Sequence, residues 1–503
     1  MNRAVCPPCM FKRTLIAGLL MLLGAATVVC AATPASPAPG HPATHAPNII
    51  LILTDDEDWK AHEFLPQVRR LLEERGATFS NYFVGYSLCC PSRSSILRGQ
   101  YAHNTGVLGN HPPEGGFERF YRQGLEASTV ATWLQQRGYY TALAGKYLNG
   151  YGSTSLAGGP RHVPAGWTDW FGLVDPSQYF DYTVSDDGRT LRFGHADADY
   201  LTDVLRRHAI AVIRAARAAH RPLFLYLAPK APHLPAEPAP RHRGLFDHAE
   251  LPRGAAFDED DVNDKPAPVR ERSHLGELEV LRLEKIYRNR LRSLQAVDEM
   301  VAAIVDELRA NGTLDDTYLI YTSDNGWHMG EHRLGAGKNT PYEEDIRVPL
   351  VIRGPGIAPG TVIPQLALNS DLAPTIAELA GATLPDFVDG RSLVPLWRGP
   401  TPAWRQCLLV QRGANSAGQQ DEGDEVHSPW GFHALRTAQY LYAAWSNGDR
   451  ELYDLLADPA ELRNLAATGD PVLVGQLAGR LDALATCRGA ECRRLEDAPL
   501  VTP

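Results

Sequence analysis

The chain has 503 residues, of which 44% are apolar and 21% charged, and it contains 44 Gly, 38 Pro and 8 Cys. This composition is that of an ordinary globular protein, and it excludes disordered, collagenous, coiled-coil and disulfide-dense chains. The length suffices for one large α/β domain and a smaller partner. The formal charge of −10 argues against a nucleic-acid-binding surface built on bulk positive charge.

The first 32 residues have the pattern of a secretory signal peptide. Basic residues precede an uncharged apolar run from Leu15 to Val29, and small residues suited to cleavage follow it. The run is short for a helix that spans a bilayer, which argues against a membrane anchor, while Cys30 leaves a lipoprotein open. Residues 33–46 are rich in Ala and Pro and predict a linker. We therefore expect export to the periplasm or the extracellular space, with the lysosome as the less favoured alternative.

Short apolar runs alternate with helical patterns along the next part of the chain. Helical spacing of apolar residues occurs at 201–208 and 291–308. Residues 257–272 are charged and interrupted by proline, which predicts a surface loop. Buried strands are predicted at 48–53, 139–144, 222–228, 317–322 and 348–352. This alternation predicts an α/β fold with a large, mostly parallel sheet between helices.

The pattern breaks near residues 396–403, where proline and glycine interrupt it. Further β-rich runs and a terminal helix follow, and they predict a smaller C-terminal subdomain with an antiparallel sheet. We therefore place the main domain at 47–398 and this subdomain at 399–503. Cys487 and Cys492 enclose a short loop and are the favoured disulfide, with metal binding as the alternative.

Polar residues follow four of the predicted strands at their carboxyl ends. Ligands of open α/β sheets bind outside these ends, so the residues are expected to form one site. The Asp and Asn residues among them offer only oxygen ligands, which hard cations such as Ca²⁺ or Mg²⁺ prefer. Two adjacent Asp residues can alternatively form a turn or a helix cap. The residues are Asp55 and Asp56, Lys146, His233, and Asp324 and Asn325.

Residues 89–93 have the sequence Cys-Cys-Pro-Ser-Arg and open a predicted helix, with Pro91 in its first turn. A helix N-terminus favours anions, and Arg93 adds donors that match a tetrahedral oxyanion. A buried cysteine pair beside an arbitrary Arg is the alternative interpretation of this segment taken alone.

The Cys-x-Pro-Ser-Arg motif resembles that of the type I sulfatases, which belong to the alkaline-phosphatase-like superfamily. The resemblance implies that fold, and it implies that a maturation enzyme oxidises Cys89 to formylglycine. Within the family, the Cys89-Cys90 pair and the Lys146-Tyr-Leu-Asn149 run are most similar to N-acetylglucosamine-6-sulfatases and extracellular heparan 6-O-sulfatases. Other matching segments lie between residues 47 and 465 and include 53–56, 231–233, 322–326 and 335–338.

The resemblance also assigns roles in the site. Hydrated formylglycine at position 89 attacks sulfur beside Arg93, while Lys146 and Lys338 bind sulfate oxygens. His233 protonates the leaving oxygen, because imidazole titrates near neutral pH, and Lys338 is the alternative donor. The implied Ca²⁺ ligands are Asp55, Asp56, residue 89, Asp324 and Asn325.

Three further residues are weaker candidates for contacts to sugar or sulfate. Asn149 and His328 match the resemblance to the glucosamine-specific group, and His332 is less favoured than either. Leu148 stands where many sulfatases carry a histidine, so the base that completes the reaction is unassigned.

The function implied is hydrolysis of sulfate esters, most specifically of 6-O-sulfate on N-acetylglucosamine or glucosamine in glycans. Its partners would be a sulfated carbohydrate and the formylglycine-generating enzyme, with no nucleic acid and no integral membrane domain after signal cleavage. The alternatives are a phosphodiesterase or phosphonate monoester hydrolase of the same superfamily, a general arylsulfatase, and a non-catalytic protein that binds sulfated glycans.

Overall fold

The computed structural model describes residues 46–153, 155–399, 403–413 and 429–500. The predicted signal peptide and nearly all of the predicted linker lie outside the described residues. The described residues form one compact unit, so the boundary between residues 398 and 399 stays a prediction. Within the described ranges, no helix combines the length and the apolar character needed to cross a membrane.

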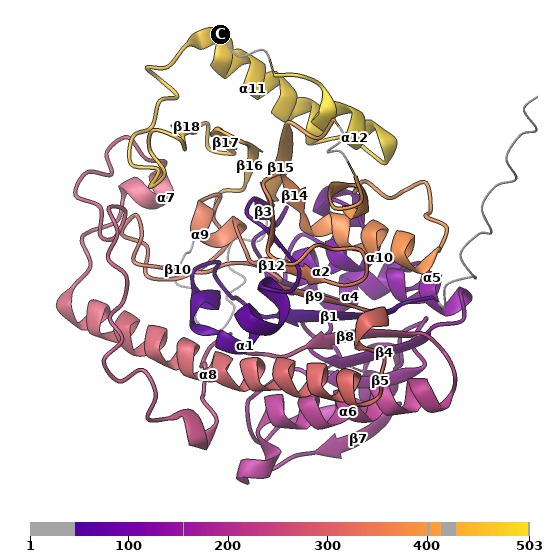
Figure 1. The fold of residues 1–503 in the computed structure, drawn as a ribbon. Helices are drawn as coiled ribbons and strands as arrows, with labels where there is room; N and C mark the ends of the chain where they lie inside the picture. Colours follow the sequence, from indigo (N-terminus) through magenta and orange to yellow (C-terminus); the bar gives the residue numbers. More distant parts are fainter. Residues whose placement is uncertain (1–45, 154, 400–402, 414–428, 501–503) are drawn as a thin grey trace, which may run out of the picture. The chain divides into compact units, whose positions relative to one another are not determined.

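A ten-stranded sheet forms the centre of this unit (Figure 1). Its middle five strands run parallel to one another, and antiparallel pairs occur on both sides. The strand order is β13 (Thr361–Ile363), β2 (Ala77–Phe79), β12 (Leu350–Arg353), β9 (Thr317–Ser323), β1 (Asn48–Thr54), β8 (Leu223–Ala228), β4 (Tyr140–Gly145), β5 (Asp169–Leu173), β6 (Thr183–Asp186) and β7 (Arg189–Arg192). The predicted mostly parallel sheet is confirmed.

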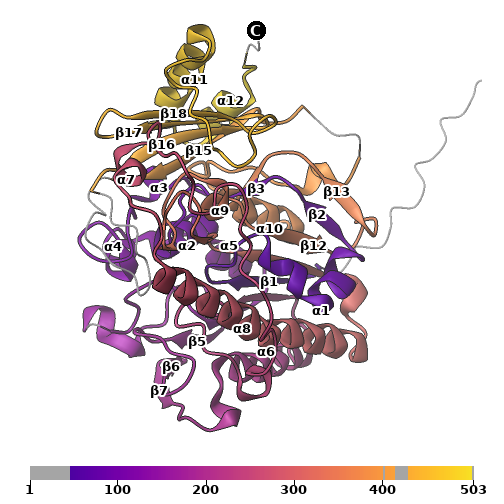
Figure 2. The same ribbon diagram turned by 90° about the vertical axis from the view of Figure 1, so that its left-hand side faces the viewer.

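Helices cover both faces of the sheet (Figure 2). Successive side chains of a strand point to opposite faces, and β1 shows this directly. Ile49 and Leu51 pack in the cluster that contains Leu97, whereas Ile50 and Ile52 pack in the other large cluster. The first face carries α2 (Cys89–Arg98), α5 (Val130–Gln136) and α10 (Leu372–Ala380), and the second carries α6 (Leu201–Ala218) and α8 (Glu277–Ala310).

Short elements complete the main domain. The helices among them are α1 (Pro66–Val68), α3 (Ala102–Thr105), α4 (Gly116–Arg122), α7 (Ala267–Arg270) and α9 (Glu343–Ile346). Two small two-stranded sheets pair β10 (His328–Met329) with β11 (Ala336–Gly337), and β14 (Ala367–Leu368) with β3 (Tyr82–Phe83).

The C-terminal part contains a separate antiparallel sheet, as the sequence predicts. Its strands are β15 (Cys407–Arg412), β16 (Phe432–Thr437), β17 (Tyr440–Trp445) and β18 (Arg450–Asp454). The helices α11 (Pro471–Leu484) and α12 (Ala490–Asp497) pack on it. The predicted disulfide joins Cys487, which follows α11, to Cys492 in α12. The Tyr342 hydroxyl donates to Glu451 over 2.8 Å and joins this sheet to the main domain.

The structure adds two details to the sequence interpretation. The strand expected at 348–352 is β12, which runs antiparallel to β9, because apolar content reports burial but not direction. Residues 257–272 lie at the surface as predicted, but not all of their side chains are solvated. Val262 and Lys265 are buried, and the Lys265 ammonium lies 3.0 Å from Glu259 and donates to the Leu462 carbonyl over 2.6 Å. Charged residues can be buried in this way when they are paired.

Candidate active site

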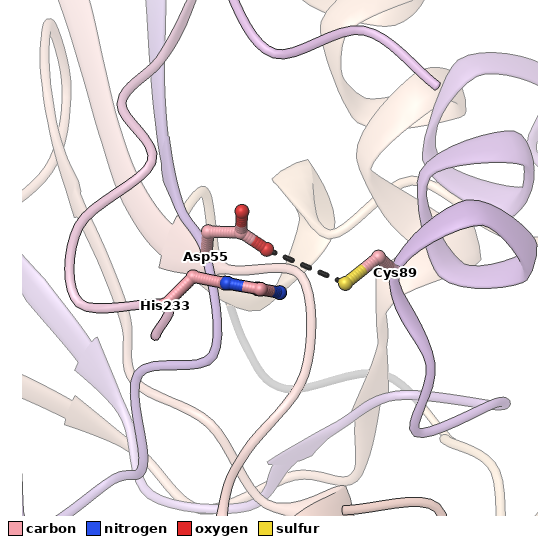
Figure 3. Close-up of side chains that lie close together, drawn as sticks. All are labelled: Asp55, Cys89 and His233. Atoms are coloured by element: carbon pink, nitrogen blue, oxygen red, sulfur yellow. Dashed lines mark hydrogen bonds between the residues drawn. The ribbon is translucent and has the colours of Figure 1, made fainter. Parts of the chain in front are cut away.

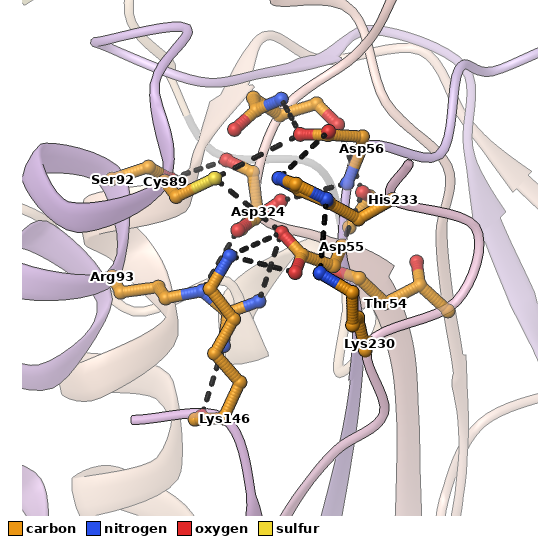
Figure 4. A network of polar contacts seen from close by, with 12 residues as sticks. Thr54, Asp55, Asp56, Cys89, Ser92, Arg93, Lys146, Lys230, His233 and Asp324 are labelled. Atoms are coloured by element: carbon orange, nitrogen blue, oxygen red, sulfur yellow. Dashed lines mark hydrogen bonds and ion pairs between the residues drawn. The ribbon is translucent and has the colours of Figure 1, made fainter. Parts of the chain in front are cut away.

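Four adjacent strands deliver the predicted polar residues to one edge of the sheet. β9, β1, β8 and β4 are neighbours and parallel, so their carboxyl ends meet. The residues beyond those ends are Asp324 and Asn325, Asp55 and Asp56, His233, and Lys146. Figure 4 shows these side chains, except the unlabelled Asn325, converging with Cys89. The predicted gathering of these residues at one site is therefore observed.

Cys89 is the first residue of α2 and is completely buried. Its Sγ lies 3.4 Å from Asp55 Oδ1 and 3.8 Å from Asp56 Oδ1, and Figure 3 shows it facing Asp55 and His233. Lys338 donates to the same sulfur over 2.9 Å. Burial raises the pKa of the thiol well above its ordinary value, although Lys146 and Lys338 act in the opposite direction. The unmodified thiol is therefore a poor nucleophile, since thiolate is the reactive form.

Each buried carboxylate of the site contacts a buried cation. Lys146 Nζ lies 2.7 Å from Asp55 Oδ2, and Lys338 Nζ lies 2.6 Å from Asp56 Oδ1. Arg93 Nε lies 2.7 Å from Asp324 Oδ2. All of these cationic groups also surround residue 89, where they can bind the oxygens of an anionic ester.

The pKa values of the carboxyl groups differ according to their neighbours. Burial alone would raise the pKa of Asp55, but Lys146, His233 and Arg93 hold it well below its ordinary value. For Asp56, Lys338 and His233 likewise outweigh burial and lower the pKa. Burial raises the pKa of Asp324 even though Arg93 lies beside it.

The residues at this edge fit a hard divalent cation. Ligand atoms of Asp55, Asp56, Cys89 and Asp324 all lie within 4.8 Å of one another. Among the residues that the structure describes, Asp56 Oδ2 and the side-chain oxygen of Asn325 are buried without a hydrogen-bond partner. Buried polar atoms are nearly always paired, so these oxygens are available as ligands.

His233 lies at the same edge, and Lys230 lies beside it. His233 Nε2 is 3.7 Å from Asp56 Oδ2, and Nδ1 is 2.8 Å from the Leu234 carbonyl. Lys230 Nζ is 3.3 Å from Nδ1. Burial and the Lys230 ammonium lower the pKa of His233 to about 4, despite the nearby Asp residues. The imidazole is therefore neutral in the free site at neutral pH, with Nδ1–H donating to Leu234.

The weaker candidates contact other groups. His328 Nδ1 lies 2.8 Å from Asp345 Oδ1, which fixes its ring. The side-chain oxygen of Asn149 is buried without a hydrogen-bond partner within the described ranges. His332 Nδ1 lies 2.7 Å from Glu259 and takes part in a different cluster.

Three residues that support the site were not singled out from the sequence. The Ser92 hydroxyl donates to the Asp324 carbonyl, and Arg290 donates to the Asp56 carbonyl over 2.5 Å. Lys230 contacts His233, as described above. Ser92 stands inside the Cys-Pro-Ser-Arg motif, and Lys230 stands three residues before His233. Their closeness in sequence to predicted site residues could therefore have indicated that both belong to the site. Arg290 lies in α8, far away in sequence, and carried no such signal.

This fold, with acidic side chains at the carboxyl edge of the sheet and residue 89 at a helix N-terminus, is that of the alkaline-phosphatase-like class. Comparison with known proteins narrows the class. The sulfatase family model matches residues 47–382, and the model described as N-sulphoglucosamine sulphohydrolase, C-terminal, matches residues 330–485. The chain belongs to the sulfatase family and is a sulfuric ester hydrolase.

Individual relatives cover nearly the whole chain. Human N-acetylglucosamine-6-sulfatase is 35% identical, over 90% of this chain and 86% of its own. An arylsulfatase from Volvox carteri is 37% identical, over 96% of this chain and 79% of its own. A solved structure in complex with its substrate D-glucosamine-2-N,6-O-disulfate has a TM-score of 0.72 and 26% identity, over 90% of this chain and 100% of that one.

Proposed function

We propose that this sulfatase removes 6-O-sulfate from N-acetylglucosamine or glucosamine residues of glycans, with formylglycine at position 89 and one Ca²⁺. The observation that carries the proposal is the placement of Cys89 at the start of α2, enclosed by three buried carboxylates and three buried cations. The human relative named for this reaction and the neighbour bound to a 6-O-sulfated glucosamine support the substrate.

The cation would be held by oxygens from two strand ends and by residue 89. Asp55, Asp56, Asp324 and Asn325 supply the protein ligands, and an all-oxygen set suits Ca²⁺. Formylglycine at position 89 would supply the nucleophile for attack on sulfur, and the cation would polarise the ester oxygens. The three Asp charges are balanced by Lys146, Lys338 and Arg93, so the cation's charge is available for the anionic ester.

Lys146, Lys338 and Arg93 bind the sulfate oxygens in this proposal. Their ammonium and guanidinium groups are already fixed by Asp55, Asp56 and Asp324, so little reorganisation is needed as charge develops. His233 places Nε2 in the same cluster and gives a proton to the departing sugar oxygen. It must first be protonated, which the negative charge of a bound ester favours. Lys338 is the alternative donor.

Mass spectrometry of the chain purified from its native host tests the nucleophile. The tryptic fragment from Gly76 to Arg93 contains both cysteines of the motif. We expect Cys89 to have exchanged its sulfur for an aldehyde oxygen, while Cys90 remains a thiol. An unmodified Cys89 in active protein would contradict the formylglycine proposal and the need for a maturation enzyme.

Sulfate release from a panel of esters tests the substrate. We expect N-acetylglucosamine 6-sulfate to have a higher kcat/KM than 4-nitrophenyl sulfate or an aryl phosphonate monoester, and Cys89→Ala to abolish release from all of them. Preference for the aryl sulfate would favour the general arylsulfatase, which the Volvox relative supports. Binding of the sulfated sugar without release would indicate a non-catalytic protein.

We also propose that the chain is exported after cleavage of residues 1–32. Two animal relatives are named as extracellular sulfatases, which supports this. N-terminal sequencing of the protein from the periplasm and from the medium tests it, and retention of Met1 in a cytoplasmic fraction would contradict it.

A further inference from the structure

A second group of ionisable side chains, two of them buried and one half-buried, lies apart from Cys89. It consists of His332, Glu344 and Glu461, and one ligand atom of each lies within 4.8 Å of the other two. Two of the residues lie near each other in the sequence, and the third, Glu461, lies far from both. His332 lies between β10 and β11, Glu344 lies in α9, and Glu461 follows β18.

His332 has one ring nitrogen fixed and the other available. Its Nδ1 lies 2.7 Å from Glu259 Oε2, and because a carboxylate accepts, this nitrogen carries the proton. Glu259 is in turn held by Lys265 at 3.0 Å. His332 is 1% exposed, and its Nε2 has no hydrogen-bond partner among the described residues. A carboxylate behind the imidazole is the arrangement that orients histidine ligands in metal sites.

Glu461 presents a second buried atom to the same place. It is 1% exposed, and its Oε2 accepts from the backbone N–H of Glu343 over 3.2 Å. Its Oε1 has no hydrogen-bond partner within the part of the chain that the structure describes. Burial, together with Glu343 and Glu344, raises the pKa of Glu461 well above its ordinary value. The buried Oε1 atom is therefore placed to bind a cation.

Two cationic side chains lie nearby, and one of them pairs with a member of the group, Glu344. Arg436 Nε lies 2.7 Å from Glu343 Oε1, and Lys60 lies 3.4 Å from Glu344 Oε1. Glu344 also lines two neighbouring cavities of about 330 and 540 Å³, which provide a route for an ion. The other acidic group lining both cavities is Glu331, whose pKa is raised by burial and by Glu344.

We propose that His332 Nε2, Glu344 and Glu461 bind a second divalent cation, of borderline type such as Zn²⁺. One imidazole nitrogen and two carboxylate oxygens suit Zn²⁺, whereas Ca²⁺ prefers oxygen alone. The cation joins the loop that leads to Lys338 with the segment after β18. It therefore fixes the C-terminal part of the chain against one wall of the active site.

The test counts bound zinc in the full chain. The Cys89→Ser background is used, because Asp55, Cys89 and His233 also lie close enough to bind zinc through the unmodified thiol. The protein is loaded with Zn²⁺ in excess Ca²⁺, desalted, and analysed by elemental mass spectrometry. We expect one Zn²⁺ per chain, and anomalous X-ray scattering at the zinc edge should locate it at His332.

Matched variants assign the site. His332→Ala and Glu461→Gln should each lower the zinc affinity at least about 10-fold. Glu259→Gln should lower it about 10- to 100-fold, because Glu259 is not a ligand but orients the imidazole of His332. His195→Ala is the control, because His195 also pairs with a carboxylate, Asp181 at 2.8 Å, but on the surface. It should retain full zinc binding.

Two results would overturn the proposal. The first is a Cys89→Ser protein that retains no zinc, which would mean that the cluster holds a proton instead. The second is unchanged zinc binding in Glu461→Gln. This variant preserves the size of the side chain, so it remains a valid test if His332→Ala fails to fold. Neither result depends on the catalytic proposal, since no turnover is measured.

Discussion

Replacing His233 with Ala separates the proton donor from the groups that bind sulfate. The ring is buried, held through Nδ1 at 2.8 Å from the Leu234 carbonyl, and places Nε2 3.7 Å from Asp56 Oδ2. It is therefore fixed at the site, and the cation that it contacts, Lys230, is not one of the proposed sulfate-binding groups. Lys338, in contrast, contacts both Asp56 and Cys89.

The expected loss of kcat in His233→Ala depends on the leaving group of the ester. A positioned general acid contributes about 10²- to 10⁴-fold to the rate, equivalent to about 3–5 kcal/mol of activation free energy. A sugar hydroxyl needs that proton to depart, whereas 4-nitrophenolate departs without it. His233→Ala should therefore lower kcat for N-acetylglucosamine 6-sulfate by about 100-fold or more, and for 4-nitrophenyl sulfate by less than about 10-fold.

The assay measures kcat for both esters in the wild type and three variants. Lys338→Ala should lower both rates similarly, because sulfate binding is lost whichever ester is used. His208→Gln is the control, because His208, in α6, pairs with Asp169 of β5 at 2.8 Å and is not part of the site. This variant should leave both rates unchanged. Equal losses for the two esters in His233→Ala would refute its role as the acid, and a selective loss in Lys338→Ala would transfer that role to Lys338.

Three further predictions concern the cation and the stability of the C-terminal part. Dialysis against a chelator should lower turnover by about 100-fold or more, with Ca²⁺ restoring it, because a metal ion supplies several kcal/mol of charge stabilisation; full activity after verified metal removal would contradict the site. Arg405→Met removes buried ion pairs to Asp371 at 2.7 Å and Glu496 at 3.2 Å, and should lower the free energy of unfolding by about 3–5 kcal/mol in urea. Replacement of the exposed Arg398 with Met is the control, and it should lower the free energy of unfolding by less than about 1 kcal/mol. Equal losses of stability in the two variants would refute the reasoning. Replacing both Cys487 and Cys492 with Ser should lower that free energy by about 2 kcal/mol, the value for so short a loop, and an unchanged urea midpoint would argue against it.

The parallel core of the fold could be predicted because its strands are buried on both faces. β1, β4, β8 and β9 are continuous apolar runs, and such runs are typical of parallel sheets covered by helices. The direction of β12 could not be predicted, because burial has the same sequence pattern in either direction. Nor could the burial of Lys265 be predicted, since its partners Glu259 and the Leu462 carbonyl meet it only in the folded chain.

The residues that follow each strand and the motif at Cys89 could be recognised from the sequence alone. Strand ends are local features, and parallel neighbours bring them to one edge, so Asp55 and Asp324 could be expected to meet. The pairing of each cation with its carboxylate became visible only in the folded chain. The same holds for the lowering of the His233 pKa by burial and Lys230. The meeting of His332 with Glu461 also became visible only there. Pair distances and desolvation depend on the packing of segments far apart in the chain, and no local pattern encodes them.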